Sequence, residues 1–156
     1  MKKLTYFLLS LLSFTSFAQN IFQEGYVIKN DGNKKVIFIR NNDWNNNPTQ
    51  ISYKETENGA IEIIEIENIA EFGIGENFKF KRFTTDIDFS STNSNKLSEK
   101  STPEWKKQTV LLKILVQGET NLYQFDNGNL VRYFFGTGKK ETVEPLIYRQ
   151  YLEKSN

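Results

Sequence analysis

A tryptophan set among amide side chains is the feature of this sequence best suited to chemistry. Trp44 lies in the middle of a stretch from Asn41 to Pro48 that is rich in asparagine. An exposed indole ring offers a stacking surface, and neighbouring amides such as those of Asn45 and Asn46 donate and accept hydrogen bonds. This combination is suited to binding sugars or peptides. The alternative is that Trp44 folds back to cover the hydrophobic core while the asparagines supply turn conformations.

A second tryptophan, Trp105, follows Pro103 in a long polar segment, and the same two interpretations apply to it. The other aromatic groups, at residues 78–83 and 133–135, are typical of a core. The candidate ligand-binding residues are therefore Trp44, Asn45, Asn46 and Trp105.

Paired carboxylates are the only catalytic arrangement that the composition favours. A pair of acids can hydrolyse a glycoside, one acting as the acid and the other as base or nucleophile. Four glutamates are clustered in the sequence, but they follow the alternation of a solvated strand face: Glu62, Glu65, Glu67 and Glu71.

Two loops match ion-binding or phosphate-binding motifs only in part. The segment 86–90 opens like a calcium loop, yet the positions that require Gly and Glu hold Ser91 and Leu97. The segment 136–139 ends in Gly-Lys, but a phosphate loop would need Gly at Tyr133 and a hydroxyl residue at Lys140. We expect a strand and a hairpin loop instead.

The residue types that are missing exclude most other chemistry. The chain has no Cys and no His, and its single Met is Met1. Disulfides, His-based triads, Cys nucleophiles and the usual zinc, copper, haem and iron–sulfur ligand sets therefore lose essential parts. We expect no catalytic residue, no metal and no cofactor.

The elements that position these residues are predicted to be β-strands. Apolar and polar residues alternate between turns that contain Asp-Gly or Asn-Gly, which is a strong hairpin signal. The expected strands lie near residues 26–28, 36–39, 51–53, 61–66, 69–74, 78–89, 109–116, 121–125 and 130–135. The phase change among the isoleucines at 61–66 favours a bulge. The near-continuous apolar run at 109–116 predicts a strand buried on both faces.

The expected fold class is all-β: a predominantly antiparallel meander of about eight to nine strands, forming a sandwich or a partly closed barrel. The segment from Leu146 to Leu152 would be a final strand or one short C-terminal helix. Residues 90–107 are polar and contain Pro103, so we expect a mobile loop there, within a single domain over residues 19–156.

The first residues predict where the protein acts. Lys2 and Lys3 precede an apolar run from Leu4 to Phe17, and Ala18 ends a segment that fits signal-peptide cleavage. We expect residues 1–18 to be removed and the protein to be exported to the periplasm, the outer-membrane periphery or the cell exterior, with no further membrane-spanning segment. The charges nearly balance, at 20 Lys+Arg and 19 Asp+Glu, which argues against nucleic acid as a partner.

The sequence also resembles a recurrent family of uncharacterised secreted flavobacterial (Bacteroidetes) proteins. The resemblance is carried by the start FQEGYVIKNDG, the block NNDWNNNPTQISYKETENG, the strand pair TVLLKILVQGETNLYQF and the segment NLVRYFF. It covers nearly all of residues 1–150 and implies a β-rich exported protein, with no activity to carry across. Family members usually continue beyond the LIYRQYL segment, so the resemblance implies that this chain is a shortened version or lacks a final helix or tail.

The sequence therefore predicts an exported, non-enzymatic domain that binds an envelope protein or a surface glycan. Two alternatives stay open at this point. One is an accessory or assembly protein associated with the outer membrane, and the other is a carboxylate-based glycan hydrolase.

Overall fold

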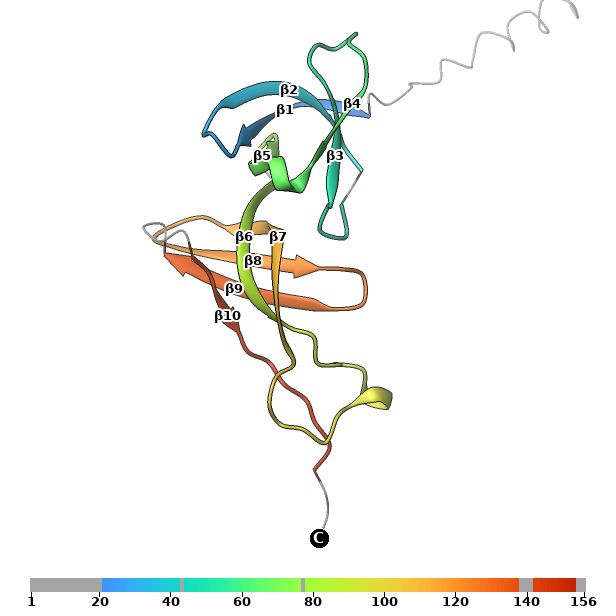
Figure 1. Cartoon of the computed structure of the whole chain (residues 1–156), viewed down its shortest axis with the longest axis vertical. Helices are drawn as coiled ribbons and strands as arrows, with labels where there is room; N and C mark the ends of the chain where they lie inside the picture. Colours follow the sequence, from blue (N-terminus) through green and yellow to red (C-terminus); the bar gives the residue numbers. More distant parts are fainter. Residues whose placement is uncertain (1–20, 43, 77, 138–141, 154–156) are drawn as a thin grey trace, which may run out of the picture.

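The computed structural model describes residues 21–42, 44–76, 78–137 and 142–153, so the predicted signal peptide lies outside the described residues. Ten strands form one antiparallel sheet (Figure 1). Their bounds are β1 (Phe22–Lys29), β2 (Lys34–Arg40), β3 (Gln50–Lys54), β4 (Glu62–Glu65), β5 (Ile69–Ile74), β6 (Phe78–Asp88), β7 (Trp105–Val116), β8 (Thr120–Asp126), β9 (Val131–Thr137) and β10 (Glu144–Leu146). Two short 3-10 turns, η2 (Ile66–Asn68) and η3 (Ser94–Lys96), complete the elements. No helix within the described ranges is long and apolar enough to cross a membrane.

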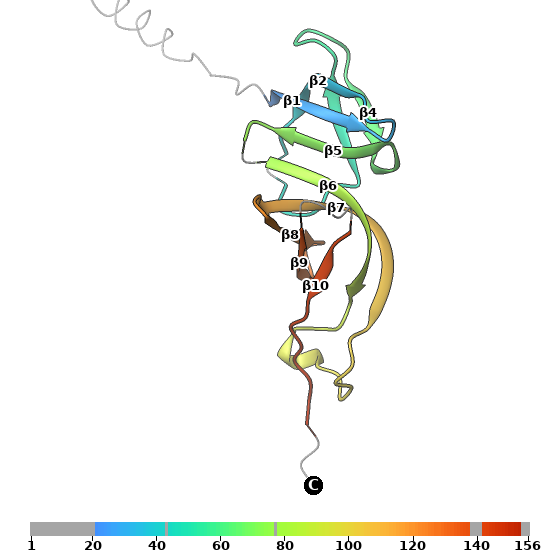
Figure 2. The same ribbon diagram turned by 90° about the vertical axis from the view of Figure 1, so that its left-hand side faces the viewer.

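The strand order confirms the predicted all-β class and its partly closed barrel. The order is β10-β9-β8-β7-β6-β5-β1-β2-β3-β4, so two meanders meet where β5 pairs with β1. The sheet curls into an open half-barrel at each end, and β6 runs from one half of the molecule into the other (Figures 1 and 2). The sequence underestimated the strand number because the shortest strand, β10, has only three residues.

Two turns show why the hairpins form where the sequence predicts them. Gly32 joins β1 to β2 with a φ of 82°, and Gly128 joins β8 to β9 with a φ of 86°. Glycine adopts positive φ without steric cost. The neighbouring aspartates, Asp31 and Asp126, each accept a backbone N–H two residues further on, which closes the turn.

The sheet has a hydrophobic core on each side of β6 and β7. Phe80 and Leu111 belong to the first core, which β1, β2, β3 and β5 complete. Phe83 and Leu112 belong to the second core, which β8 and β9 complete. Because strand side chains alternate, adjacent residues point to opposite cores, and both Leu111 and Leu112 are 0 % exposed. Burial on both faces is therefore confirmed for the middle of the predicted run, residues 110–114, but not for its end, where Leu115 and Val116 are 40 % and 54 % exposed.

A buried polar cluster closes the second half of the molecule, beside the loop that follows β6. The Asp88 carboxylate accepts hydrogen bonds from Ser90 and from the Glu104 N–H, at 2.9 Å for each backbone donor. Arg132 donates to the carbonyl oxygens of Asp88 and Ser90, at 2.8 Å and 2.6 Å. Burial alone would raise the pKa of the Asp88 carboxyl, but these hydrogen bonds and the Arg132 charge hold it below its usual value.

Three details differ from the sequence-based expectation: the start of β7, the pairing of β4 and the structure of the C-terminal segment. β7 begins at Trp105, so residues 105–107 of the predicted loop pair with the end of β6 instead. β4 pairs regularly with β3 and has no bulge. The phase change among the isoleucines falls between Ile63 and Ile64, which lie on opposite faces of β4: Ile63 is exposed and Ile64 is partly buried on the first core.

The segment from Leu146 to Leu152, expected to be a final strand or a short helix, is neither beyond Leu146: the final strand, β10, ends there, and residues 147–153 have no regular structure. Their apolar side chains, such as Ile147 and Tyr148, are exposed. A short helix without a packed face has little stability. The segment lies instead against the long loop, where the Leu152 N–H donates to the Ser98 carbonyl oxygen at 3.0 Å.

Candidate functional site: a cleft under the asparagine loop

The loop between β2 and β3, residues 41–49, carries three of the four predicted site residues, and we call it the asparagine loop. It lies against the middle of the sheet, where β6, β7 and β8 run side by side. Hydrogen bonds of Asn47 hold the loop against β7 and β8. The Asn47 N–H donates to the Asp126 carbonyl oxygen at 2.7 Å, the Asp126 N–H donates to the Asn47 side-chain oxygen at 2.6 Å, and the Asn47 amide donates to the Leu111 carbonyl oxygen.

Trp44 packs inward from this loop. Its ring centroid lies 5.2 Å from that of Phe72 and 5.8 Å from that of Phe80, with an edge-to-face geometry in both cases. Those two phenylalanines stack on each other at 5.0 Å. The indole is half-buried on the first core. Its position therefore matches the core-covering interpretation, although part of the ring still faces outward.

A cleft of about 250 Å³ separates the loop from the sheet. Phe80, Lys113 and Gln124 form its floor, because these residues are directly paired across β6, β7 and β8. The whole lining, which we call the asparagine-loop cleft, consists of Trp44, Asn45, Asn46, Asn47, Phe80, Lys113, Gln124 and Asp126. A second hollow of about 390 Å³ lies along the loop itself and shares Trp44 and the asparagines with the cleft.

Neutral, negatively charged and positively charged polar side chains all line this cleft. Asp126 supplies a carboxylate, Lys113 an ammonium group, and Gln124 an amide that donates to the Asp126 carboxylate at 3.4 Å. The Lys113 ammonium also lies 5.0 Å from the centroid of the Phe78 ring. Amide, carboxylate and ammonium groups above aromatic rings form hydrogen bonds and stacking contacts with a polar ligand.

The structure brings together Trp44, Asn45 and Asn46 but not Trp105. Trp105 begins β7, eight residues before Lys113, which is about 26 Å along a strand. Its side chain is 41 % exposed and its strand partner is Asp88. Trp105 is therefore no part of the cleft.

The sequence analysis missed Asn47, Lys113, Gln124 and Asp126. One feature of the sequence could have pointed to Lys113: it is the single charged residue within the apolar run at 109–116. No local sequence feature points to Gln124 or Asp126, since they reach the loop only through the pairing of distant strands.

The other predicted motifs do not form sites among the described residues. Glu62 accepts from the Tyr53 hydroxyl at 2.9 Å, and Glu71 accepts from the Tyr26 hydroxyl at 2.7 Å. Burial and the Glu71 contact raise the pKa of the Tyr26 hydroxyl above its ordinary value. The Asp88 carboxylate accepts a hydrogen bond from the Glu104 N–H at the base of the loop between β6 and β7. Part of the 136–139 motif lies outside the described residues.

No group of three or more potential metal ligands gathers within the part of the chain that the structure describes. In comparisons with known proteins, no family model, curated protein or solved structure matches this chain. The candidate site is therefore defined by its geometry alone.

Proposed function

We propose that this protein is a non-enzymatic binding module and that the asparagine-loop cleft is its ligand site. One observation carries the proposal: amide, carboxylate and ammonium side chains from a loop and two strands converge above an aromatic floor in one cleft. Such a mixture of polar groups and rings fixes the orientation of a small polar ligand.

Glycans are the ligand class that this lining fits best. Sugar hydroxyls both donate and accept hydrogen bonds, so they match neutral amides such as those of Asn45 and Gln124. The apolar face of a sugar ring packs on aromatic side chains, and the half-buried Trp44 is the ring that this cleft offers for such a contact, because Phe80 is only 1 % exposed. Asp126 is the one carboxylate among the described residues of the lining, so the pair of acids needed for glycoside hydrolysis finds no support in this cleft.

The binding test is calorimetric titration of the protein with a panel of neutral oligosaccharides, alongside tryptophan fluorescence. We expect at least one to bind and to change the Trp44 emission. Asn45→Ala and Gln124→Ala should each weaken that binding about tenfold, which corresponds to about 1.4 kcal/mol. Asn58→Ala is the matched control, because Asn58 is an exposed asparagine in the turn between β3 and β4.

Two outcomes contradict the proposal. If neither substitution in the cleft weakens binding more than Asn58→Ala does, the ligand binds elsewhere. If the protein releases new reducing ends from the bound glycan and Asp126→Asn stops the release, the protein is a hydrolase.

We further propose that binding takes place outside the inner membrane, because residues 1–18 have the sequence pattern of a signal peptide. Fractionation of cells that express the full chain, followed by N-terminal sequencing, tests this. The expected product begins at Gln19 and lies in the periplasm, at the outer membrane or in the medium. An uncut chain in the cytoplasm overturns the proposal.

A further inference from the structure

The strand β4 is one of the two edges of the sheet, and it carries an exposed apolar surface. It pairs with β3 on one side only. Ile61 and Ile63, whose side chains are 59 % and 58 % exposed, lie on or beside it. Edge strands are protected by shortness, by charged side chains, by Pro or by a bulge. β4 has no Lys, Pro or bulge, and its protection is its length of four residues and the charges of Glu62 and Glu65, whereas the opposite edge strand, β10, contains Pro145.

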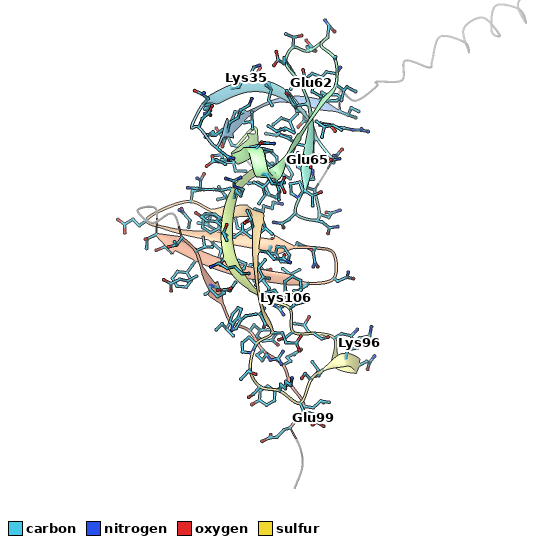
Figure 3. The ribbon with its side chains drawn as sticks, in the orientation of Figure 1. Lys35, Glu62, Glu65, Lys96, Glu99 and Lys106 are labelled. Atoms are coloured by element: carbon cyan, nitrogen blue, oxygen red, sulfur yellow. The ribbon has the colours of Figure 1, made fainter. Side chains whose placement is uncertain are left out.

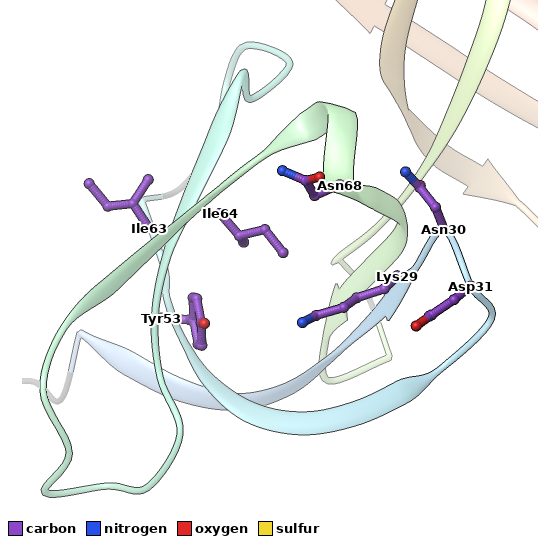
Figure 4. Close-up of a pocket in the computed structure, with 7 residues that line it drawn as sticks. All are labelled: Lys29, Asn30, Asp31, Tyr53, Ile63, Ile64 and Asn68. Atoms are coloured by element: carbon purple, nitrogen blue, oxygen red, sulfur yellow. The ribbon is translucent and has the colours of Figure 1, made fainter.

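A cavity lies beside this edge, inside the curl that β1, β2, β3 and β4 form. It measures about 410 Å³ and is lined by Lys29, Asn30, Asp31, Tyr53, Ile63, Ile64 and Asn68. Figure 4 shows that Ile64, Lys29 and Asn68 point into the space within the curl, while Ile63 points away from it. The cavity thus extends from β4 to the turn that joins β1 to β2.

The edge is strongly acidic. Four glutamates lie on β4 or in the turn before it, at positions 55, 57, 62 and 65, and Glu55 is ion-paired with Lys35. Two of them, Glu62 and Glu65, lie on β4 itself, and Figure 3 shows both at this end of the molecule. A basic occupant complements these carboxylates, whereas a second copy of β4 would place like charges opposite one another, which costs free energy.

We propose that β4 binds an extended, basic segment of a partner protein by strand addition. The backbone of the segment would pair with the free edge of β4, and its inward side chains would reach the cavity between Tyr53 and Lys29. The exposed Ile61 and Ile63 would pack against its outward apolar residues. This surface is separate from the asparagine-loop cleft, so a negative result for one proposal does not contradict the other.

The test uses a capped peptide of alternating lysine and valine, about seven residues long, which is the length of an ordinary strand. Hydrogen exchange measured by NMR should show protection of β4 amides when the peptide binds. A peptide with glutamate in place of lysine, and one with proline at its central valine, should each bind at least about tenfold more weakly. Added salt should weaken the lysine peptide's binding.

Ile63→Lys in the full chain should weaken binding of the lysine peptide at least about tenfold, because it places a positive charge on the edge. Val36→Lys is the matched control: Val36 is 61 % exposed and lies on β2, where it pairs with Tyr26 of β1 and is no part of β4.

The proposal is overturned if the lysine peptide leaves the β4 amides unprotected, if the glutamate peptide binds equally well, or if both lysine variants behave alike. Self-association that Ile63→Lys abolishes in sedimentation equilibrium also overturns it, in favour of a second copy as the occupant.

Discussion

At the scale of single residues, the buried Asp88 carboxylate stabilises the fold through the hydrogen bonds that it accepts from Ser90 and Glu104. Its pKa is lowered in the folded protein, so its contribution to stability is present above the unfolded pKa of about 3.9 and is lost as the pH falls through the folded value. We predict that Asp88→Asn lowers the free energy of unfolding by about 1–3 kcal/mol at neutral pH. The difference from wild type should shrink below about pH 4.

Urea denaturation over a range of pH measures this effect. Asp86→Asn is the control, since Asp86 is an exposed carboxylate two residues away on the same strand. If the two variants have the same pH dependence, the Asp88 cluster does not stabilise the fold through its charge.

Trp44 has a structural role at the same scale. Removing its ring would expose the stacked pair of Phe72 and Phe80. We predict that Trp44→Ala lowers the free energy of unfolding by about 2–4 kcal/mol and that Trp44→Phe recovers part of the loss. Equilibrium unfolding in urea is the measurement. Unchanged stability of Trp44→Ala would mean that the indole is free for ligand binding alone.

At the scale of elements, the junction between β1 and β5 depends on close backbone approach. A Cβ placed on Gly25 would collide with the carbonyl oxygen of Gly73, and one placed on Gly73 would lie 2.8 Å from the Tyr26 ring. We predict that Gly25→Ala lowers the free energy of unfolding by about 1–3 kcal/mol and that hydrogen exchange becomes faster in β1 and β5.

Gly118→Ala is the matched control for that substitution. A Cβ on Gly118 meets only the Thr120 carbonyl oxygen, at 3.7 Å, which is ordinary contact. Its stability should therefore stay near that of wild type. Equal loss in both variants would point to a general effect of glycine replacement instead of a clash between β1 and β5.

Elements that depend on neighbouring residues were predictable from the sequence, and those that depend on distant pairing were not. Asp31-Gly32 and the turn at Gly128 fix their hairpins locally, and both were identified. The cleft was only half predicted, because Asn45 and Asn46 reach Gln124 through strand pairing that no local pattern encodes. The phase change at residues 61–66 fitted a bulge, but it comes from isoleucines on both faces of a regular strand, which local sequence does not distinguish from a bulge.

At the scale of the whole molecule, one pair of long strands serves two cores. Leu111 and Leu112 are neighbours in sequence, equally buried, and belong to opposite cores. We predict that Leu111→Ala and Leu112→Ala each lower the free energy of unfolding by about 2–5 kcal/mol. Hydrogen exchange should separate them, with faster exchange in β1 and β2 for the first and in β8 and β9 for the second.

Each of the two leucine variants is the control for the other. They differ by one residue in position and not at all in chemistry, so a shared exchange pattern would mean that the molecule opens as one unit. Distinct patterns would mean that each half can loosen while the other stays folded.

The insertion of β5 between β1 and β6 also bears on how the chain reaches its native state. Among the ten described strands, β1 and β5 are the one pair of hydrogen-bonded neighbours that are not consecutive along the chain. The hairpin loops are short except for the one between β6 and β7, which spans residues 89–104, whereas the pairing of β1 with β5 joins residues as far apart as Gly25 and Ile74. Closing a longer loop costs more chain entropy, and folding slows as contacts become less local. We therefore expect the local hairpins to form before β1 pairs with β5, and the first core, which draws residues from both meanders, to be completed only with that pairing.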